Sequence, residues 1–199
     1  GTFVVARGRE TEARVRALAR DLGVDVAGLT EAPPVPVDAL RLPRVGLYKS
    51  WVPNADEGWT RWLLDAYAFP VDTLHDADVR AGVNAGDLGR YDVIVLPDQR
   101  PAAIRNGHAP GTMPPEYVGG LGAEGSAALK RYVEQGGTLV AFDDASDYVI
   151  EQFGLPLRNV VDGVDDEQFF VPGSLLRVEV DTRHPYGFGM ADTAAVVFA

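Results

Sequence analysis

Two nearly continuous apolar stretches limit what this chain can fold into. YDVIVLP (residues 91–97) and TLVAF (residues 138–142) carry aliphatic or aromatic residues at nearly every position. A strand that is apolar on both faces has to be covered on both faces, which is typical of a parallel sheet between two layers of helices. The two stretches therefore predict an α/β domain.

The segments around these stretches complete an alternation of strands and helices. RVGLYKS (44–50) and PVDTLH (70–75) read as further strands, and helices are predicted over 55–67, up to residue 135, and over 147–154. SLLRVEV and AAVVF supply late strands. With right-handed crossovers, this order predicts a three-layer sandwich whose mostly parallel, doubly wound sheet has its strand carboxyl ends at one edge.

Apolar spacing indicates which helix faces are buried. Asn54 can cap the helix that starts at residue 55, and its apolar residues recur at helical spacing. The residues expected on its buried face are Trp59, Trp62, Leu63 and Ala66. The residues expected to face inward on the helix before residue 135 are Leu121, Ala128, Leu129, Tyr132 and Val133.

The N-terminal part has a different character. Residues 2–6 (TFVVA) read as a short strand, and residues 10–22 as a helix with an apolar stripe (Ala13, Ala17 and Leu18) that Gly23 ends. EAPPVPVDALRLP then contains four prolines, which exclude a helix or a central strand. We therefore expect an N-terminal strand–helix segment (1–32), a proline-rich linker (33–43) and the main α/β domain (44–199).

Composition excludes several function classes. The 199 residues include 29 acidic and 18 basic side chains, for a net charge of −11, which disfavours nucleic acid and anionic membranes as partners. The absence of cysteine excludes disulfides, thiolate metal sites and a cysteine nucleophile. No apolar run approaches the length that crosses a bilayer. Composition leaves the cellular compartment undetermined. Both ends of the chain lie in strand-like sequence, so we expect a domain taken from a longer polypeptide.

The acidic turn after TLVAF is the first candidate site. Ser146 could act as a nucleophile, but no GxSxG motif surrounds it. The simpler interpretation is that Asp143, Asp144 or Ser146 caps a helix that begins near Asp147.

Three other features could carry chemistry. GGLGAEG (119–125) spells GxGxxG, but TMPPEYV before it is no buried strand, so a flexible entry into a helix is favoured over a dinucleotide site. His75, His108 and His184 occur in no HExxH or HxxE pattern, which disfavours a metal site, although His75 lies close to two aspartates. The acidic stretch 162–167 is most simply a solvated loop, with weak calcium binding as the alternative.

The long segment 98–120 is rich in glycine and proline, and loops of this length often contact a ligand or a partner. The alternative is an ordered loop that packs over the end of the sheet. Its candidate contact residues are Arg100, Arg105, His108, Glu116 and Tyr117.

Five stretches taken together suggest a family. DEGWTRWLLDAYAFP, YDVIVLPDQ, HAPGTMPPEYVGGLGAEG, YVEQGGTLVAFDDAS and GSLLRVEVDTRHPYGFGM resemble the C-terminal region of bacterial zinc carboxypeptidase-like proteins. In these proteins a carboxypeptidase A-type catalytic domain precedes a domain similar to class I glutamine amidotransferases, which are flavodoxin-like. The resemblance implies a fold that would place a cysteine in the turn where this chain has Asp143 to Ser146. It transfers no catalytic residue, and parents of this kind are often exported, to the periplasm or beyond.

The resemblance leads to one expected function and two alternatives. We expect a non-catalytic accessory domain that packs against or regulates a peptidase domain of the same polypeptide, with no cofactor in this chain and zinc only in that peptidase. One alternative is a small-molecule or sugar-binding domain; the other is a hydrolase that uses Ser146. The candidate ligand contacts at the strand-end edge are Trp51, Asp98, Arg100, His108, Asp144 and Ser146. The sequence leaves open whether the chain forms a homo-oligomer.

Overall fold

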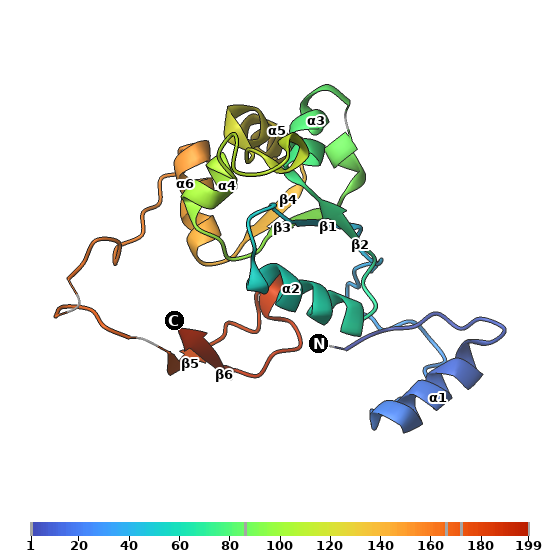
Figure 1. Ribbon diagram of the computed structural model, residues 1–199. Helices are drawn as coiled ribbons and strands as arrows, with labels where there is room; N and C mark the ends of the chain where they lie inside the picture. The colour runs from blue at the N-terminus through green and yellow to red at the C-terminus, as the bar shows by residue number, and fades with distance from the viewer. Residues whose placement is uncertain (1, 86, 166, 172, 199) are drawn as a thin grey trace. The chain divides into compact units, whose positions relative to one another are not determined.

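The computed structural model describes residues 2–85, 87–165, 167–171 and 173–198 (Figure 1). The chain divides into two units, one formed by Arg41–Gly163 and the other by Gly1–Leu40 together with Val164–Ala199. The described helices include none that is both long enough and apolar enough to cross a bilayer. The sheet and the candidate site belong to the first unit.

Four parallel strands form the sheet of the first unit. They are β1 (Val45–Tyr48), β2 (Val71–Leu74), β3 (Val93–Leu96) and β4 (Thr138–Ala141), in the order β2-β1-β3-β4. This is the start of the flavodoxin-like doubly wound order. The parallel α/β sheet predicted from the apolar stretches is confirmed.

Helices cover both faces of the sheet (Figure 1). α2 (Ala55–Ala66) lies on one face, and the other face carries α3 (Asp76–Ala85), α4 (Pro101–Asn106), α5 (Gly122–Glu134) and α6 (Asp144–Phe153). The predicted three-layer arrangement is therefore confirmed. The prediction that segment 98–120 is one long loop is wrong in part, because the segment contains α4 and the short helix η2 (Pro115–Tyr117).

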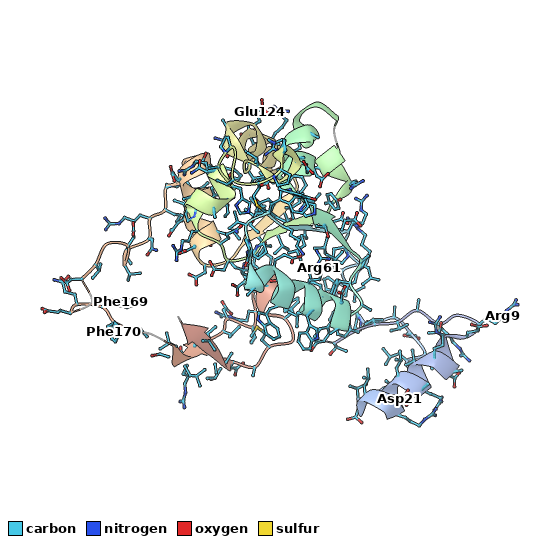
Figure 2. All side chains as sticks on the ribbon, in the orientation of Figure 1. Arg9, Asp21, Arg61, Glu124, Phe169 and Phe170 are labelled. Carbon is cyan, nitrogen blue, oxygen red and sulfur yellow. The ribbon has the colours of Figure 1, made fainter. Side chains whose placement is uncertain are left out.

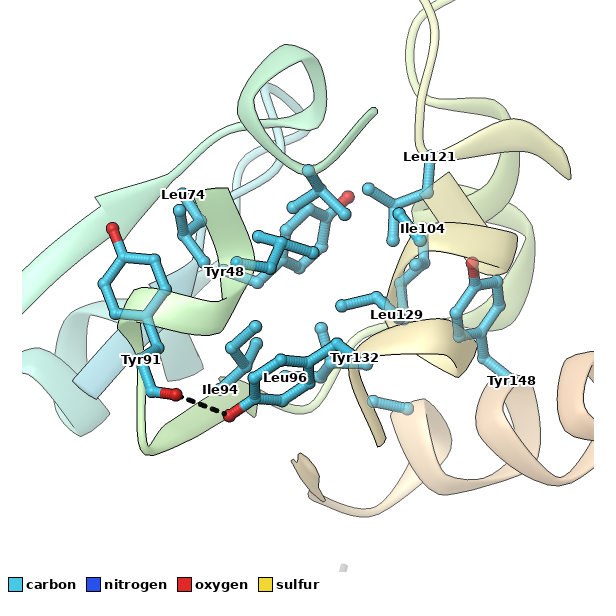
Figure 3. Close-up of a cluster of buried hydrophobic side chains, with 14 residues drawn as sticks. Tyr48, Leu74, Tyr91, Ile94, Leu96, Ile104, Leu121, Leu129, Tyr132 and Tyr148 are labelled. Carbon is cyan, nitrogen blue, oxygen red and sulfur yellow. Dashed lines mark hydrogen bonds between the residues drawn. The ribbon is translucent and has the colours of Figure 1, made fainter. Parts of the chain in front are cut away.

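The main core lies between the sheet and the four helices of its second face (Figure 3). Leu121, Ala128, Leu129 and Tyr132 are buried there as predicted, whereas Val133 is exposed. The Tyr132 hydroxyl donates to the backbone oxygen of Tyr91, drawn as a dashed line in Figure 3. The other buried members of this core are Tyr48, Leu74, Val79, Leu88, Tyr91, Ile94, Leu96, Ile104, Ala145 and Tyr148.

The prediction for the buried face of α2 is wrong. Trp59, Trp62, Leu63 and Ala66 are all exposed. The helix instead turns Leu64 toward the small core under it, together with Glu57, which is buried and accepts a hydrogen bond from Arg61. Arg61 also donates to Thr73 on β2, so an ion pair and one leucine occupy the sheet-facing side. The cap at Asn54 is confirmed, since its side chain accepts from the N–H groups of residues 56 and 57.

Glycines allow two backbone segments to touch before α5. A Cβ at Gly107 would lie 1.9 Å from the backbone oxygen of Gly119, and a Cβ at Gly120 would lie 2.4 Å from that of Ile104. Gly107 and Gly120, the latter being the first glycine of the GxGxxG spelling, therefore allow close packing of the α4 segment against the entrance to α5.

The second unit contains a helix and a hairpin. α1 (Thr11–Leu22) ends at Gly23 in the left-handed conformation, as predicted, but none of its residues is buried. Residues 2–6 form no strand, contrary to prediction, because a strand needs a partner and the described chain offers none there. β5 (Ser174–Glu179) and β6 (Thr193–Phe198) pair antiparallel, with the short helix η3 (Pro185–Gly187) between them.

Two arginines fix the entrance to β1 through Asp92, just before β3. Arg41 donates to both carboxylate oxygens at 2.8 and 2.7 Å, and Arg44 adds its backbone N–H at 2.8 Å and its guanidinium at 3.2 Å. Hydrogen bonds from Arg41 and then Arg44 hold the pKa of Asp92 far below its usual value. This carboxylate therefore ties the segment before β1 to the neighbouring strand.

Asp92→Asn is expected to lower the melting temperature at neutral pH, because it removes the charge that both arginines contact. Since the folded-state pKa of Asp92 is depressed, its contribution is complete above a pH of about 4 and is lost as the pH falls further. Thermal unfolding of both proteins across this range checks the prediction. The exposed Asp65→Asn is the control, and a stability difference that persists unchanged at low pH would contradict the assignment.

Candidate functional site

The carboxyl ends of the four parallel strands meet at one edge of the sheet. Four segments follow the strands there, and each contributes polar or aromatic side chains. They are residues 50–54 after β1, residues 75–76 after β2, residues 98–100 after β3 and residues 143–146 after β4. We call this set the strand-end edge.

Asp143 occupies a strained turn between β4 and α6. Its backbone angles are φ 44° and ψ −123°, in the left-handed half of conformational space that favours glycine. A sharp, strained turn from strand to helix is the geometry in which α/β hydrolases hold their nucleophile. The strand-end edge therefore has an elbow of this kind, and the residue in it carries a carboxylate.

Asp98 accepts a hydrogen bond from the backbone N–H of Asp144, the residue that follows the elbow. The Asp144 N–H donates to Asp98 Oδ1 at 3.1 Å. In elbow enzymes this N–H stabilises the oxyanion that forms in acyl transfer. Burial, and then the negative charge of Asp143, raise the pKa of Asp98. The donor is thus already used by the chain's own carboxylate, in surroundings that repel a developing anion.

The capping prediction for this turn is wrong in detail. α6 begins at Asp144 rather than near Asp147, and Asp143 at the cap position makes no side-chain hydrogen bond to the helix. The Ser146 hydroxyl donates to the Ala141 backbone oxygen at 3.1 Å. The cap comes instead from Asp98, which lies 46 positions earlier in the sequence, so no local pattern could indicate it.

Trp51 links the loop after β1 to two other segments. The His75 ring stacks on it with 3.9 Å between centroids and 7° between planes, and the Tyr117 ring meets it at 4.6 Å and 70°. His108 Nε2 lies 3.0 Å from the Trp51 backbone oxygen. These contacts hold segment 98–120 against the edge, as its ordered-loop interpretation expects, and leave less of the Trp51 ring available to a ligand.

The described contacts place no histidine on Ser146. His75 Nδ1 lies 2.8 Å from the Lys49 backbone oxygen, His108 contacts Trp51, and His184 Nδ1 accepts from the Tyr186 N–H. A serine hydrolase needs a base within hydrogen-bond reach of the hydroxyl. Among the described residues, no three or more histidines and carboxylates form a group suited to a metal ion.

Two residues that were not among the predicted ligand contacts also lie at the strand-end edge: Asp76, which the sequence interpretation noted only as an aspartate close to His75, and Gln99. Asp76 is buried, and its Oδ1 accepts from the Tyr48 hydroxyl at 2.7 Å. Gln99 donates to the Ser50 hydroxyl at 2.9 Å. Asp76 Oδ2 and Gln99 Oε1 are buried and accept no hydrogen bond from the described residues. The sequence signal that could have identified both residues is their position shortly after the predicted strands that became β2 and β3.

Burial is the main reason that the pKa of Asp76 is raised; the hydrogen bond from Tyr48 and the charge of Arg80 act in the opposite direction. Arg100, another predicted contact, is exposed at the start of α4. The backbone oxygen of Asp98 accepts a hydrogen bond from the Asn54 side chain at 2.9 Å. The edge therefore brings Asp98, Asp143 and Asp144 together, with Trp51 and His108 in a separate aromatic group.

A hollow of about 500 Å³ lies at the opposite edge of the sheet. Its lining comes from the segments that precede β3 and β4, including Tyr91, Asp92, Gly136 and Gly137, together with Arg41. Ligands in doubly wound folds bind at the carboxyl ends of the strands, so this hollow is not in the expected position.

Comparisons with known proteins give little further information. No protein-family model matches the chain, and no curated protein is significantly similar to it. Among solved structures, a ThuA-like protein from Bacteroides uniformis ATCC 8492 is similar, with a TM-score of 0.41 and 15% identity over 83% of this chain. The match covers 62% of that protein. No zinc carboxypeptidase is among the proteins found, and the strand order and the helix layers define the fold.

The elbow can be probed with a thiol, because the chain has no cysteine of its own. In Asp143→Cys, the neighbouring Asp98 is expected to disfavour the thiolate and slow alkylation by iodoacetamide. Adding Asp98→Asn, which keeps an oxygen for the Asp144 N–H, is expected to speed alkylation by up to about tenfold, the effect of a one-unit fall in thiol pKa. Ala102→Cys serves as an exposed control. Equal rates with and without Asp98→Asn would contradict the arrangement.

Proposed function

We propose that this chain is a non-catalytic accessory domain with a class I glutamine amidotransferase-like scaffold. In this proposal it packs against or regulates the peptidase domain of a zinc carboxypeptidase-like protein. The observation that carries it is the hydrogen bond from the Asp144 N–H to Asp98. In acyl transfer this N–H would have to donate to the oxyanion instead.

The scaffold assignment is supported by two features. The strand order β2-β1-β3-β4 is flavodoxin-like, and a strained elbow connects β4 to α6, where the amidotransferase-like fold is expected to hold its cysteine. Asp143 stands in that elbow, so the thiol needed for glutamine hydrolysis is replaced by a carboxylate beside Asp98 and Asp144. A scaffold that keeps the elbow without the chemistry fits a binding or regulatory role.

The peptidase partner is supported by the resemblance of the five sequence stretches. In this assignment zinc belongs to the peptidase domain, which would supply both the metal ligands and the catalytic residues. The contribution of this chain would be a surface for that domain. The absence of any histidine contact on Ser146 among the described residues supports the accessory role over the hydrolase alternative.

Activity assays test the first half of the proposal. The purified chain is expected to hydrolyse neither glutamine nor peptides with a free C-terminus, with or without added zinc. Active enzymes of both classes, assayed in parallel, control for the substrates. Turnover that Asp143→Asn or Ser146→Ala abolishes would reject the non-catalytic assignment.

Association tests the second half. Mixed with a zinc carboxypeptidase domain of the resembled family, the chain is expected to form a complex that sediments faster than either protein. No association in the micromolar range would reject the peptidase partner and leave the non-catalytic assignment unaffected.

Small-molecule binding at the strand-end edge is the second candidate function. The observation that favours it is that the buried oxygens Asp76 Oδ2 and Gln99 Oε1 accept no hydrogen bond within the part of the chain that the structure describes. Buried acceptors are normally satisfied, and a sugar or polyol hydroxyl could satisfy them. Trp51, Asp98, Arg100 and Asp144 would be the surrounding contacts.

Thermal-shift measurements against a panel of monosaccharides and polyols test this candidate. A true ligand is expected to raise the melting temperature in a concentration-dependent way, and Gln99→Leu is expected to abolish the shift. Tyr117→Phe is a control that keeps the aromatic contact with Trp51. No shift with any member of the panel at millimolar concentration would reject the candidate.

A further inference from the structure

α2 presents its largest apolar side chains to solvent. The exposed fractions are 68% for Trp59, 62% for Trp62, 50% for Leu63 and 71% for Tyr67, the residue that follows the helix at its C-cap. These four residues recur at helical spacing, and we call them the α2 stripe. Contiguous exposed apolar patches are uncommon on soluble monomers and mark interaction surfaces.

The orientation of α2 is fixed by specific contacts, so the stripe is not exposed through loose packing. Glu57 is buried and forms ion pairs with Arg61 at 2.7 Å and with Lys49 at 3.3 Å. Arg61, labelled in Figure 2, also donates to Thr73 on β2 at 2.9 Å. Rotating α2 to bury its tryptophans would break this network and leave the Glu57 charge without its partners.

The charges around the stripe indicate the chemistry of its partner. Asp56 and Asp65 are exposed on the same helix, whereas its basic residue, Arg61, is engaged with Glu57. The chain as a whole carries a net charge of −11. An apolar surface with an acidic rim is complementary to an apolar surface with a rim of lysine and arginine.

We propose that the α2 stripe is the docking face for a protein partner whose contact surface has an apolar centre and a basic rim. The inference rests on the accessory role proposed above, to which it assigns a surface. Trp59 and Trp62 are its expected anchors, since tryptophan and tyrosine dominate binding energy at protein interfaces.

Other occupants fit the stripe less well. A second copy of this chain would bring the same acidic rim against itself. Anionic lipid is repelled by the same charge. The rings of Trp59 and Trp62 meet at 84° with 6.3 Å between centroids, so they do not form the flat platform on which a sugar chain stacks.

Two synthetic amphipathic helical peptides of equal length provide the probe. Both carry the same leucine face, and one has a rim of lysine while the other has a rim of glutamate. Titration calorimetry on the full chain is expected to show binding of the lysine peptide at least tenfold tighter than that of the glutamate peptide. Added salt is expected to reduce the difference.

The matched variants are Trp59→Ala with Trp62→Ala, and Leu157→Ala as an exposed apolar control elsewhere in the same unit. The double variant is expected to lose about 30-fold or more in affinity for the lysine peptide, the effect of removing a single strong anchor residue. The control is expected to bind like the parent. Circular dichroism verifies that each variant is folded.

Several results would overturn the proposal: equal binding of the two peptides, no binding of either, or unchanged binding by the double variant. Self-association that the double variant abolishes would identify a second copy as the occupant instead. Binding to vesicles of phosphatidylserine and phosphatidylcholine, or to cello-oligosaccharides, through the two tryptophans would assign the stripe to those ligands. Turnover by the isolated chain would reject the accessory role without affecting these results.

Discussion

The first unit depends on the burial of β1 and β3 between two layers that differ in character. On one face, strand residues such as Tyr48 and Ile94 form a large core with tyrosines and aliphatic side chains from four helices. On the other face only three residues of the sheet, Val45, Leu47 and Val95, are buried, with Leu64 from α2 packed against them. This asymmetry explains why α2 could evolve an ion pair on its inner side. The small core under it requires little apolar area from the helix.

The strand-end edge combines a strained elbow backbone with neighbouring carboxylates that disfavour a developing anion. The strained conformation of Asp143 has an energetic cost that the surrounding structure has to offset, since non-glycine residues in such regions are strained. The hydrogen bond from the Asp144 N–H to Asp98 helps to offset it by joining the ends of β3 and β4. The result is a closed corner in which a backbone geometry used elsewhere for reactivity contributes to stability.

Much of the fold could be predicted from the sequence, because periodicity and composition act locally. The apolar stretches over β3 and β4 indicated a covered parallel sheet, and Asn54 and Gly23 indicated helix ends. The orientation of α2 could not be predicted, since it depends on Glu57 meeting Lys49 and Thr73 meeting Arg61 across the fold. Trp59 and Trp62 dominated the apolar pattern of the helix, but Leu64 is the residue that packs against the sheet.

The position of the candidate site in the fold could be predicted from the sequence, but the contacts between its residues could not. The rule that parallel strands end at one edge indicated in advance that Asp98 and Asp144 lie close together, whereas Trp51 lies at the same edge in a separate aromatic group. The capping of α6 by Asp98, the stacking of His75 on Trp51 and the hydrogen bond from Tyr48 to Asp76 each join segments far apart in the chain. Such pairings depend on register and loop path, which single-sequence patterns do not encode.

The close approach at Gly107 and Gly120 affects how homologous sequences should be interpreted. A methyl group at either position would collide with a backbone oxygen, so selection for a well-packed chain alone would keep both glycines through long divergence. An alignment would then show two invariant glycines 13 positions apart, of which Gly120 is also the first glycine of the GxGxxG spelling, maintained by steric exclusion between two backbone segments. Invariance at these positions would report on the architecture of the family and carry no information about what its members bind.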